Sequence, residues 1–199
     1  MLITVEGLDG AGKTTLVAGL SAALAERGEH VLVLREPGGV EVSERIRELL
    51  KDPALEIDPR AEALLYAAAR AQLVAQELRP LLDSGATVLL DRFVDSSLAY
   101  QGAGRGLGVE AIRQLNAFGT GGLTPDRTLL LRIDPSAGLG RIADRPADRV
   151  EQEDVAFFAT IAAAYDALAA AEPERFAVID AAQPPDSVLA AALAALQPA

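Results

Sequence analysis

The most informative stretch of this chain is GLDGAGKTT, residues 7–15. It follows the apolar run LITVE, residues 2–6, which predicts a short strand, and it leads into a segment of helical periodicity over residues 14–27. Its glycine and lysine positions fit the pattern G-x-x-x-x-G-K-[ST], which forms a phosphate-binding loop when a strand precedes it and a helix follows it. The alternative is a plain glycine-rich turn, and both the spacing and the two flanks argue against that alternative.

The residue types in this loop suit a polyphosphate. Glycines let the backbone N–H groups turn inward toward phosphate oxygens, and the following helix adds the partial positive charge of its N-terminus. Lys13 can reach the β- and γ-phosphates, and the Thr14 hydroxyl can ligate Mg²⁺. The stretch therefore predicts a nucleoside-triphosphate site. The residues expected to bind the nucleotide there are Gly7, Leu8, Asp9, Gly10, Ala11, Gly12, Lys13, Thr14 and Thr15.

Composition limits the other chemistry that the chain can perform. Its 199 residues suit one domain, which we expect to cover residues 1–199. With no cysteine and one histidine, the chain lacks the residues for disulfides, thiolate metal sites and histidine-based triads. A net charge of −11 argues against a nucleic-acid partner. The apolar runs are too short for a membrane span and no export signal is visible, so we expect a cytoplasmic protein with no membrane partner.

Short apolar runs alternate with segments of helical periodicity along the whole chain. Strands are expected at residues 2–6, 30–35, 86–91, 127–134 and 175–181, and the main helices at residues 14–27, 40–51, 59–82, 135–143, 155–171 and 185–197. Residues 101–108, QGAGRGLG, are expected to form a loop. This alternation predicts an α/β fold, with a five-stranded parallel sheet covered by helices on both faces. In such sheets ligands bind beyond the carboxyl ends of the strands.

A kinase for small phosphorylated substrates needs a second anion site opposite the first. REPGG, residues 35–39, places Arg35 and Glu36 at a strand end, although an ordinary connection can have the same composition. YAAAR places Tyr66 and Arg70 on one helix face, where the ring can stack on a base and the guanidinium can bind the base edge. The alternative for this pair is a core aromatic residue with an arginine at its margin.

Two further segments carry charges that suit phosphate chemistry. In DRFVDSSLAYQG, residues 91–102, Asp91 can hold Mg²⁺ and Arg92 can bind a phosphate with two parallel hydrogen bonds, unless the two form only a strand-end ion pair. RIADRPADRVEQED, residues 141–154, carries three arginines four residues apart among acidic residues. It is either a solvated helix face or a mobile lid that brings arginines onto the phosphates, and composition does not decide between these interpretations.

In this order, these segments resemble the thymidylate kinase family, which transfers the γ-phosphoryl group of ATP to dTMP. The resemblance covers nearly the whole chain and rests on GLDGAGKTT, REPGG, LLYAAARAQ, DRFVDSSLAYQG, PDRTLLLRID and DRVEQED. The phosphate loop alone is unspecific, whereas the aspartate inside it, REPGG and the DRF…S…AYQG pattern are specific in combination. The resemblance implies a P-loop nucleoside-monophosphate kinase fold, ATP with Mg²⁺, dTMP as the small-molecule substrate, and a homodimer.

The resemblance also implies roles for particular residues. Asp9 is implied to orient the sugar 3′-hydroxyl, and Arg35 and Arg92 to hold the dTMP phosphate. The full set implied to bind dTMP is Asp9, Arg35, Glu36, Tyr66, Arg70, Arg92, Ser97, Tyr100 and Gln101. Tyr66 would stack on thymine, with Arg70 and Ser97 at the base and Tyr100 under the sugar.

Ala11 stands where some family members have a basic residue, which makes the sequence similar to the bacterial type whose catalytic arginines come from the lid. Arg145 is then implied to contact the transferring phosphate, Arg149 to support it, and Arg141 to lie along the adenine. The residues implied to be catalytic are Lys13, Asp91, Arg92, Arg145 and Arg149, and those implied to hold the metal are Thr14 and Asp91.

The sequence departs from the family pattern at three positions, and two alternative functions stay open. Ala69 replaces a common aspartate, Phe93 replaces tyrosine or histidine, and Pro146 replaces a glycine in the lid, which leaves the assignment of the lid arginines open. A kinase for another nucleotide or a deoxynucleoside would share the phosphate loop. A non-catalytic nucleotide-binding module would instead signal by ordering residues 141–154.

Overall fold

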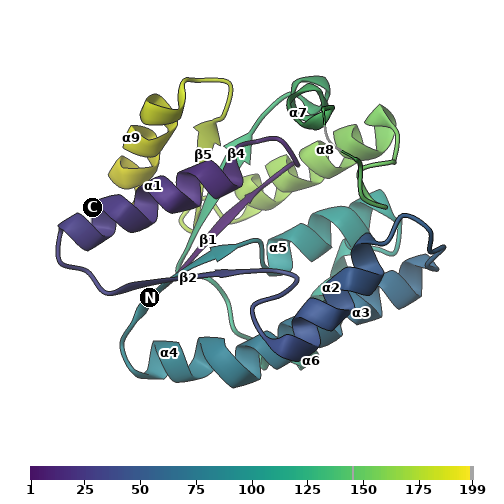
Figure 1. The fold of residues 1–199 in the computed structure, drawn as a ribbon, viewed down its shortest axis with the longest axis horizontal. Helices are drawn as coiled ribbons and strands as arrows, with labels where there is room; N and C mark the ends of the chain where they lie inside the picture. Colours follow the sequence, from purple (N-terminus) through teal and green to yellow (C-terminus); the bar gives the residue numbers. More distant parts are fainter. Residues whose placement is uncertain (145, 198–199) are drawn as a thin grey trace.

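A five-stranded parallel sheet forms the centre of the molecule in the computed structural model, which describes residues 1–144 and 146–197 (Figure 1). The strands are β1 (Leu2–Gly7), β2 (Val31–Arg35), β3 (Thr87–Asp91), β4 (Arg127–Arg132) and β5 (Phe176–Asp180), in the order β2-β3-β1-β4-β5. The parallel sheet predicted from the sequence is therefore confirmed. In the register, Val5 lies opposite Asp91 and Gly7 opposite Leu131, so the loop after β1 emerges between β3 and β4.

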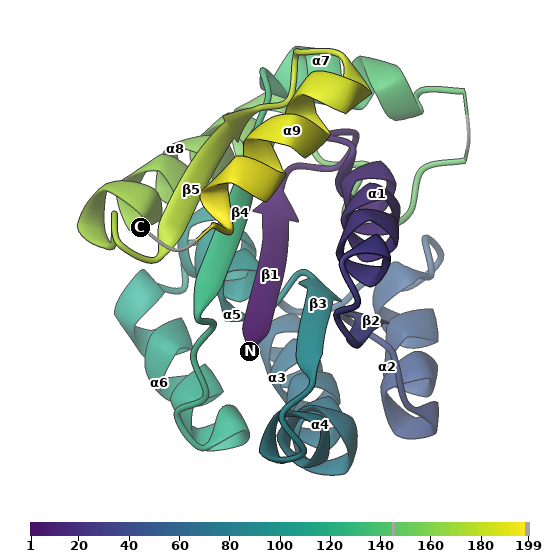
Figure 2. The ribbon, with the colours of Figure 1, turned by 90° about the vertical axis from the view of Figure 1, so that its left-hand side faces the viewer.

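Helices cover both faces of the sheet, as Figures 1 and 2 show. The helices of the described residues are α1 (Lys13–Glu26), α2 (Glu41–Lys51), α3 (Pro59–Leu73), α4 (Arg79–Asp83), α5 (Val94–Ser97), α6 (Val109–Thr120), α7 (Pro135–Ile142), α8 (Val155–Ala171) and α9 (Pro185–Ala195). Helices α1 and α9 pack on each other over one face, while α4, α5 and α8 contact the other face. Helix α3 packs between α2 and α6.

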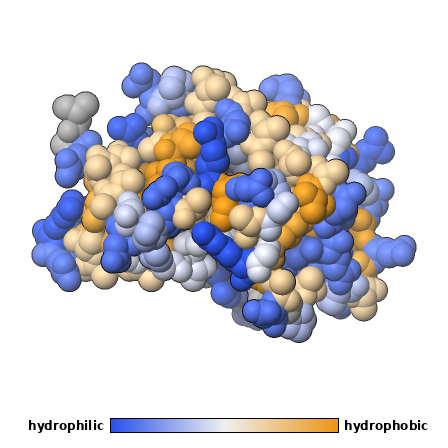
Figure 3. Space-filling model, turned by 90° about the horizontal axis from the view of Figure 1, so that it is seen from above, coloured by the Kyte–Doolittle hydropathy of each residue, from blue (hydrophilic) through white to orange (hydrophobic). Residues whose placement is uncertain are grey.

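The strand and helix sequences explain this arrangement. All six residues of β1 are buried, as expected for a central parallel strand covered on both faces. Helices α3 and α8 begin at Asp58 and Asp154, whose side chains accept hydrogen bonds from the first-turn amides of Arg60 and Phe157. None of the described helices is long and apolar enough to cross a membrane. Figure 3 shows a mosaic of hydrophilic and small hydrophobic patches on the side that lies uppermost in Figure 1.

Two sequence predictions need correction. The single helix expected over residues 59–82 is divided into α3, a π-helical turn η1 (Val74–Leu78) and α4. The loop expected over residues 101–108 begins only after Gly104, because residues 98–104 form a second π-helical turn, η2 (Leu98–Gly104). Its residues up to Gly102 are buried, and a helical turn pairs the buried backbone polar groups. A Cβ on Gly104 would lie 2.8 Å from the Phe157 ring, so this glycine permits close packing within a helical turn.

Two glycines bring the phosphate loop into direct contact with α7. A Cβ on Gly10 would lie 2.0 Å from the carbonyl oxygen of Gly138, and a Cβ on Gly138 would lie 2.8 Å from the carbonyl oxygen of Asp9. Both positions are therefore restricted to glycine by backbone contact. The contact fixes α7 against the loop that follows β1.

We expect Gly138→Ala to separate α7 from the phosphate loop and to lower the free energy of unfolding by about 1–3 kcal/mol, because the new methyl group overpacks a backbone contact. Gly140 on the same helix is the matched control, since an added Cβ there meets no atom within 4 Å. Gly140→Ala should be neutral or stabilise by up to about 1 kcal/mol through helix propensity. Urea unfolding of both variants checks this, and equal destabilisation of the two would contradict the packing described.

Candidate active site

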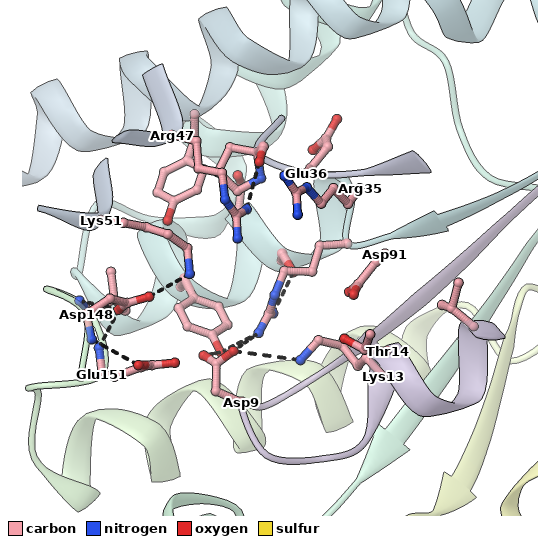
Figure 4. Close-up of a pocket in the computed structure, with 18 of the residues that line it drawn as sticks. Asp9, Lys13, Thr14, Arg35, Glu36, Arg47, Lys51, Asp91, Asp148 and Glu151 are labelled. Atoms are coloured by element: carbon pink, nitrogen blue, oxygen red, sulfur yellow. Dashed lines mark hydrogen bonds and ion pairs between the residues drawn. The ribbon is translucent and has the colours of Figure 1, made fainter. Parts of the chain in front are cut away.

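A cavity of about 790 Å³ lies beyond the carboxyl ends of β1, β2 and β3. Figure 4 shows Asp9, Lys13 and Thr14 on one side of it and Arg35, Glu36 and Arg47 on the opposite side. The predicted site residues that line this cavity are Asp9, Gly10, Gly12, Lys13, Thr14, Thr15, Arg35, Glu36, Tyr66, Arg70, Asp91, Arg92, Ser97, Tyr100, Gln101 and Arg141. Gly7, Leu8 and Ala11 are buried outside the lining, and Arg149 also lies outside it. Arg145 falls outside the described residues.

Lys13 lies folded over its own loop. It is only 8% exposed, and its Nζ donates hydrogen bonds to the carbonyl oxygens of Gly7 at 3.2 Å and Leu8 at 2.8 Å. Asp9 lies close by, with its Oδ1 3.8 Å from Nζ. Burial, together with the charge of Arg92, lowers the pKa of Lys13 to about 8. Lys13 therefore loses its proton closer to neutral pH than an ordinary lysine does.

Asp9, Arg92 and Tyr100 form one hydrogen-bonded group on the floor of the cavity. Arg92 Nη2 donates to Asp9 Oδ1 at 2.7 Å, and the Tyr100 hydroxyl donates to Asp9 Oδ2 at 3.1 Å. The guanidinium carbon of Arg92 also lies 5.1 Å from the centre of the Tyr100 ring. Burial favours the neutral form of Asp9, but the charges of Arg92 and Lys13 outweigh it and hold the pKa of Asp9 well below its usual range. The carboxylate is thus an ionised acceptor at neutral pH.

The position of Arg92 depends on a buried carboxylate at the end of β1. Arg92 has φ 69°, which is uncommon for a residue other than glycine. Glu6 Oε1 accepts a hydrogen bond from the next backbone amide, that of Phe93, at 2.7 Å, and Glu6 Oε2 accepts from the Ser96 hydroxyl at 2.6 Å. Ser96 in turn accepts from Arg92 Nη1 at 3.1 Å. Burial, and then the charge of Asp95, raise the pKa of Glu6 to about 7. The sequence analysis assigned Glu6 no role.

Arg70 is held by protein groups on every side. Its side chain is 2% exposed, and its Nε donates to Glu36 Oε2 at 2.6 Å. Its terminal nitrogens donate to Ser97 Oγ, to Asn116 Oδ1 and to the carbonyl oxygen of Phe93. No sequence pattern predicted a role for Asn116, which lies within α6. The family resemblance implies that Arg70 also binds the edge of the base. The base would then share the N–H donors of Arg70 with these protein acceptors.

Arg35 and Arg47 provide the cations of the opposite wall. Arg35 is exposed, and its Nη2 lies 3.1 Å from Glu44 Oε1 and 3.2 Å from Glu44 Oε2. Arg47 Nη1 donates to the carbonyl oxygen of Pro37 at 2.8 Å. Arg47 and Lys51 line the cavity but were missed by the sequence analysis. Their spacing of four on the helix that follows REPGG was the available signal.

Two buried carboxylate oxygens have no hydrogen-bond partner among the described residues. They are Glu36 Oε1 and Asp91 Oδ1, and both residues line the cavity. An unpaired buried acceptor costs about 1–3 kcal/mol, so a ligand or ion that satisfies it is favoured. The free oxygen of Asp91 and the exposed hydroxyl of Thr14 are hard oxygen donors of the kind that Mg²⁺ prefers. No group of three or more potential ligands that could hold a metal occurs within residues 1–144 and 146–197.

The segment of residues 141–154 is joined to the rest of the site at both of its described ends. Arg141 donates to the carbonyl oxygen of Gly10 at 3.3 Å and to that of Ala181 at 3.1 Å, so it links the phosphate loop to the loop after β5. At the other end, Arg149 donates from Nε to the carbonyl oxygen of Leu50 at 3.0 Å and from Nη2 to Glu62 Oε2 at 2.7 Å. Arg141 therefore lies at the phosphate loop, whereas Arg149 lies outside the cavity lining.

A parallel sheet with a phosphate loop after β1 and guanidinium groups across the same cavity defines the class of P-loop nucleoside-monophosphate kinases. Within that class, the family model described as thymidylate kinase matches residues 5–192. The chain belongs to the thymidylate kinase family, whose members phosphorylate dTMP to dTDP with ATP and Mg²⁺.

Similar proteins cover the chain from end to end. A thymidylate kinase from Deinococcus radiodurans is 53% identical over 197 residues, which cover 98% of this chain and 96% of the relative. One from Lactobacillus delbrueckii subsp. bulgaricus is 47% identical and covers 96% of this chain and 92% of the relative. The crystal structure of thymidylate kinase from Ehrlichia chaffeensis superposes with a TM-score of 0.81 at 31% identity, covering 99% of this chain and 98% of that one.

The lowered pKa of Lys13 predicts a pH-dependent affinity for ATP. Below pH 8 the ammonium is charged and ready for a phosphate, whereas above pH 8 the free enzyme must take up a proton before it binds. Calorimetric titration with Mg²⁺ and ATP in two buffers of different ionisation heat should therefore show proton uptake that grows from about pH 7 to about pH 9.5. The dissociation constant should rise by up to about tenfold per pH unit above 8. Lys13→Arg, which stays charged over this range, is the control, and identical proton uptake in both proteins would contradict the assignment.

Proposed function

We propose that this chain performs its phosphoryl transfer from ATP to dTMP in line, inside the single cavity described above. The observation that supports this most is that the phosphate loop with Lys13 faces the Arg35 guanidinium group across the same space, whose lining also includes Arg92. Two anions can therefore be held head to head, one against backbone amides and the other against arginines. We also propose that residues 1–199 form one domain.

On the ATP side, the loop amides of residues 7–15 bind the β-phosphate and Lys13 bridges the β- and γ-phosphates. Lys13 reaches them by exchanging its bonds to the Gly7 and Leu8 carbonyls for phosphate oxygens. Thr14 and Asp91 would hold Mg²⁺, which supplies charge neutralisation and orients the phosphates. Arg141, at the junction of the phosphate loop and the loop after β5, lies beside the adenine.

On the dTMP side, Arg35 and Arg92 bind the phosphate and Asp9 accepts a hydrogen bond from the sugar 3′-hydroxyl. Asp9 suits this role because its carboxylate is ionised at neutral pH. Tyr66 stacks on the base, and Tyr100 lies under the sugar. Glu36, Arg70, Ser97 and Gln101 complete this wall, with Glu36 and Ser97 acting partly by fixing Arg70.

The mechanism relies on position and charge rather than on a strong base. The attacking dTMP phosphate oxygen is already ionised at neutral pH, so no protein group has to remove a proton. Lys13 and Arg92 neutralise the donor and acceptor phosphates, which lets two anions approach within reacting distance. Arg145 completes the charge around the transferring group, and Arg149 supports the lid by its bonds to Glu62 and Leu50.

Coupled ADP release with a panel of nucleoside monophosphates tests this function. We expect turnover that depends on dTMP, and Lys13→Ala or Arg92→Ala should lower it by about 100- to 1,000-fold because each removes a preorganised charge. Asp166→Asn is the matched control, because this carboxylate pairs with Arg132 on the surface. Preference for another acceptor would identify a different nucleotide kinase, and tight ATP binding without acceptor-dependent turnover would identify a non-catalytic binding module.

We further propose a cytoplasmic homodimer that forms through α3 and α6. These helices pack side by side and expose Leu64 at 58% and Phe118 at 91%. Such large exposed apolar side chains favour burial against a second copy.

Phe118→Glu should convert the dimer to monomer in sedimentation-velocity measurements. Val178→Glu, on the edge strand β5 with 43% exposure, is the matched control and should leave the dimer intact. A wild-type monomer at micromolar concentration would contradict the proposal.

A further inference from the structure

Glu62 is a buried carboxylate at which four parts of the chain meet. It lies in the first turn of α3 and is 1% exposed, and it is not among the residues that line the cavity. Its Oε1 accepts a hydrogen bond from Gln101 Nε2 of η2 at 2.8 Å. Its Oε2 lies 3.2 Å from Arg105 Nη2, just after η2, and accepts from Arg149 Nη2 of the lid segment at 2.7 Å.

Stability alone does not explain a charge at this position. Removing a carboxylate from water is costly, and apolar residues of similar volume often fill such a place as well or better. The two guanidinium groups compensate the charge only while they stay where the structure has them. The carboxylate therefore specifies the positions of its partners more than it strengthens the core.

The partners of Glu62 form part of a wider attachment of residues 148–153. Lys51 Nζ donates to Asp148 Oδ2 at 2.7 Å, and Arg149 Nε donates to the carbonyl oxygen of Leu50. Arg105 pairs with Glu62 and also with Glu153 at 2.5 Å. This attached segment is thus joined to the C-terminal end of α2, to α3 and to the end of η2.

Glu62 binds two side chains, Gln101 and Arg149, that connect it to the walls of the cavity. Gln101 lines the cavity itself. Asp148, Val150 and Glu151 of the attached segment also line it, and Arg149 lies between them in the sequence. One carboxylate outside the cavity therefore fixes a residue of the η2 wall and the wall formed by residues 148–151.

We propose that Glu62 is a positioning residue for phosphoryl transfer. It touches neither nucleotide. It fixes Gln101 and, through Arg149 and Arg105, the attached segment 148–153, so that both walls keep the spacing that the reaction requires. The inference rests on the proposed function of the cavity, and its test includes a measurement that does not depend on activity.

Glu62→Gln keeps the shape of the side chain but removes the charge, and its amide can present N–H groups toward the guanidinium of Arg149. We expect kcat with dTMP to fall by about 10- to 100-fold, while KM for ATP changes by less than about threefold because the phosphate loop is untouched. Glu62→Asp, which keeps the charge on a shorter stem, should recover part of kcat. Glu62→Gln and Arg149→Gln break the same contact, so their effects should not add. The kcat of the double variant should therefore lie within about twofold of the kcat of the slower single variant.

The independent measurement is limited trypsin digestion after Arg149, followed by mass spectrometry. The Arg149 side chain is bound to Glu62 and Leu50 in the wild type, so this bond should resist cleavage, and Glu62→Gln should expose it. Leu78→Ala is the control for lost stability alone, because Leu78 is fully buried and packs with Leu2 and Val88, far from the carboxyl ends of the strands. This variant should lower Tm while kcat and the resistance after Arg149 stay close to wild type.

The outcomes separate the two proposals. A wild type without dTMP-dependent turnover would overturn the proposed function, and the digestion would then still show whether Glu62 fixes Arg149. A Glu62→Gln variant that loses Tm but keeps wild-type kcat and resistance to trypsin would overturn the role of Glu62. If Glu62→Gln does not fold, Glu62→Asp decides, because wild-type kcat and resistance in that variant would equally overturn the positioning role.

Discussion

The buried carboxylate of Glu6 ties the two anion sites of this enzyme to one strand. Glu6 is the last β1 residue before Gly7, where the phosphate loop begins, so the ATP side starts at its own backbone. Its side chain binds the Phe93 amide and Ser96, which flank Arg92 in its left-handed conformation, and in the proposed function Arg92 holds the dTMP phosphate. A change in the position of β1 therefore moves both sites together, and their separation stays constant. Phosphoryl transfer depends on that separation more than on any single donor.

Three consecutive residues of the short helix α5 each join a different hydrogen-bonded network. Asp95 pairs with Arg175 at the start of β5, Ser96 joins Glu6 to Arg92, and Ser97 accepts from Arg70. Each of these partners comes from a different part of the chain. Helix α5 continues directly into η2, and these side-chain contacts add to the backbone hydrogen bonds of its single turn. This short segment is thus bound to several other parts of the fold.

Sequence reasoning reached the sheet, the phosphate loop and most of the residues around the cavity, because each of these is encoded by a local pattern. Strand and helix periodicity and the spacing of Lys13 in its motif need no knowledge of distant residues. The π-helical turn η2 was missed, since Gly102 packs against Val109 and Gly104 against Phe157, and neither glycine serves a turn. Asn116 and Glu62 were missed for a related reason. Their partners lie 46 and 39 or more residues away, so only the folded chain brings them together.

The hydrogen bonds of Lys13 to its own loop have a consequence for turnover. Because the ammonium already has two carbonyl acceptors, an arriving phosphate replaces bonds instead of adding them. If Lys13 binds ATP as proposed, the net gain in affinity is correspondingly modest, and Lys13 can return to the same carbonyl acceptors when ADP leaves. An enzyme that must empty its site in every cycle benefits from such a reversible exchange, because ground-state binding that is too tight would slow product release without accelerating the chemistry.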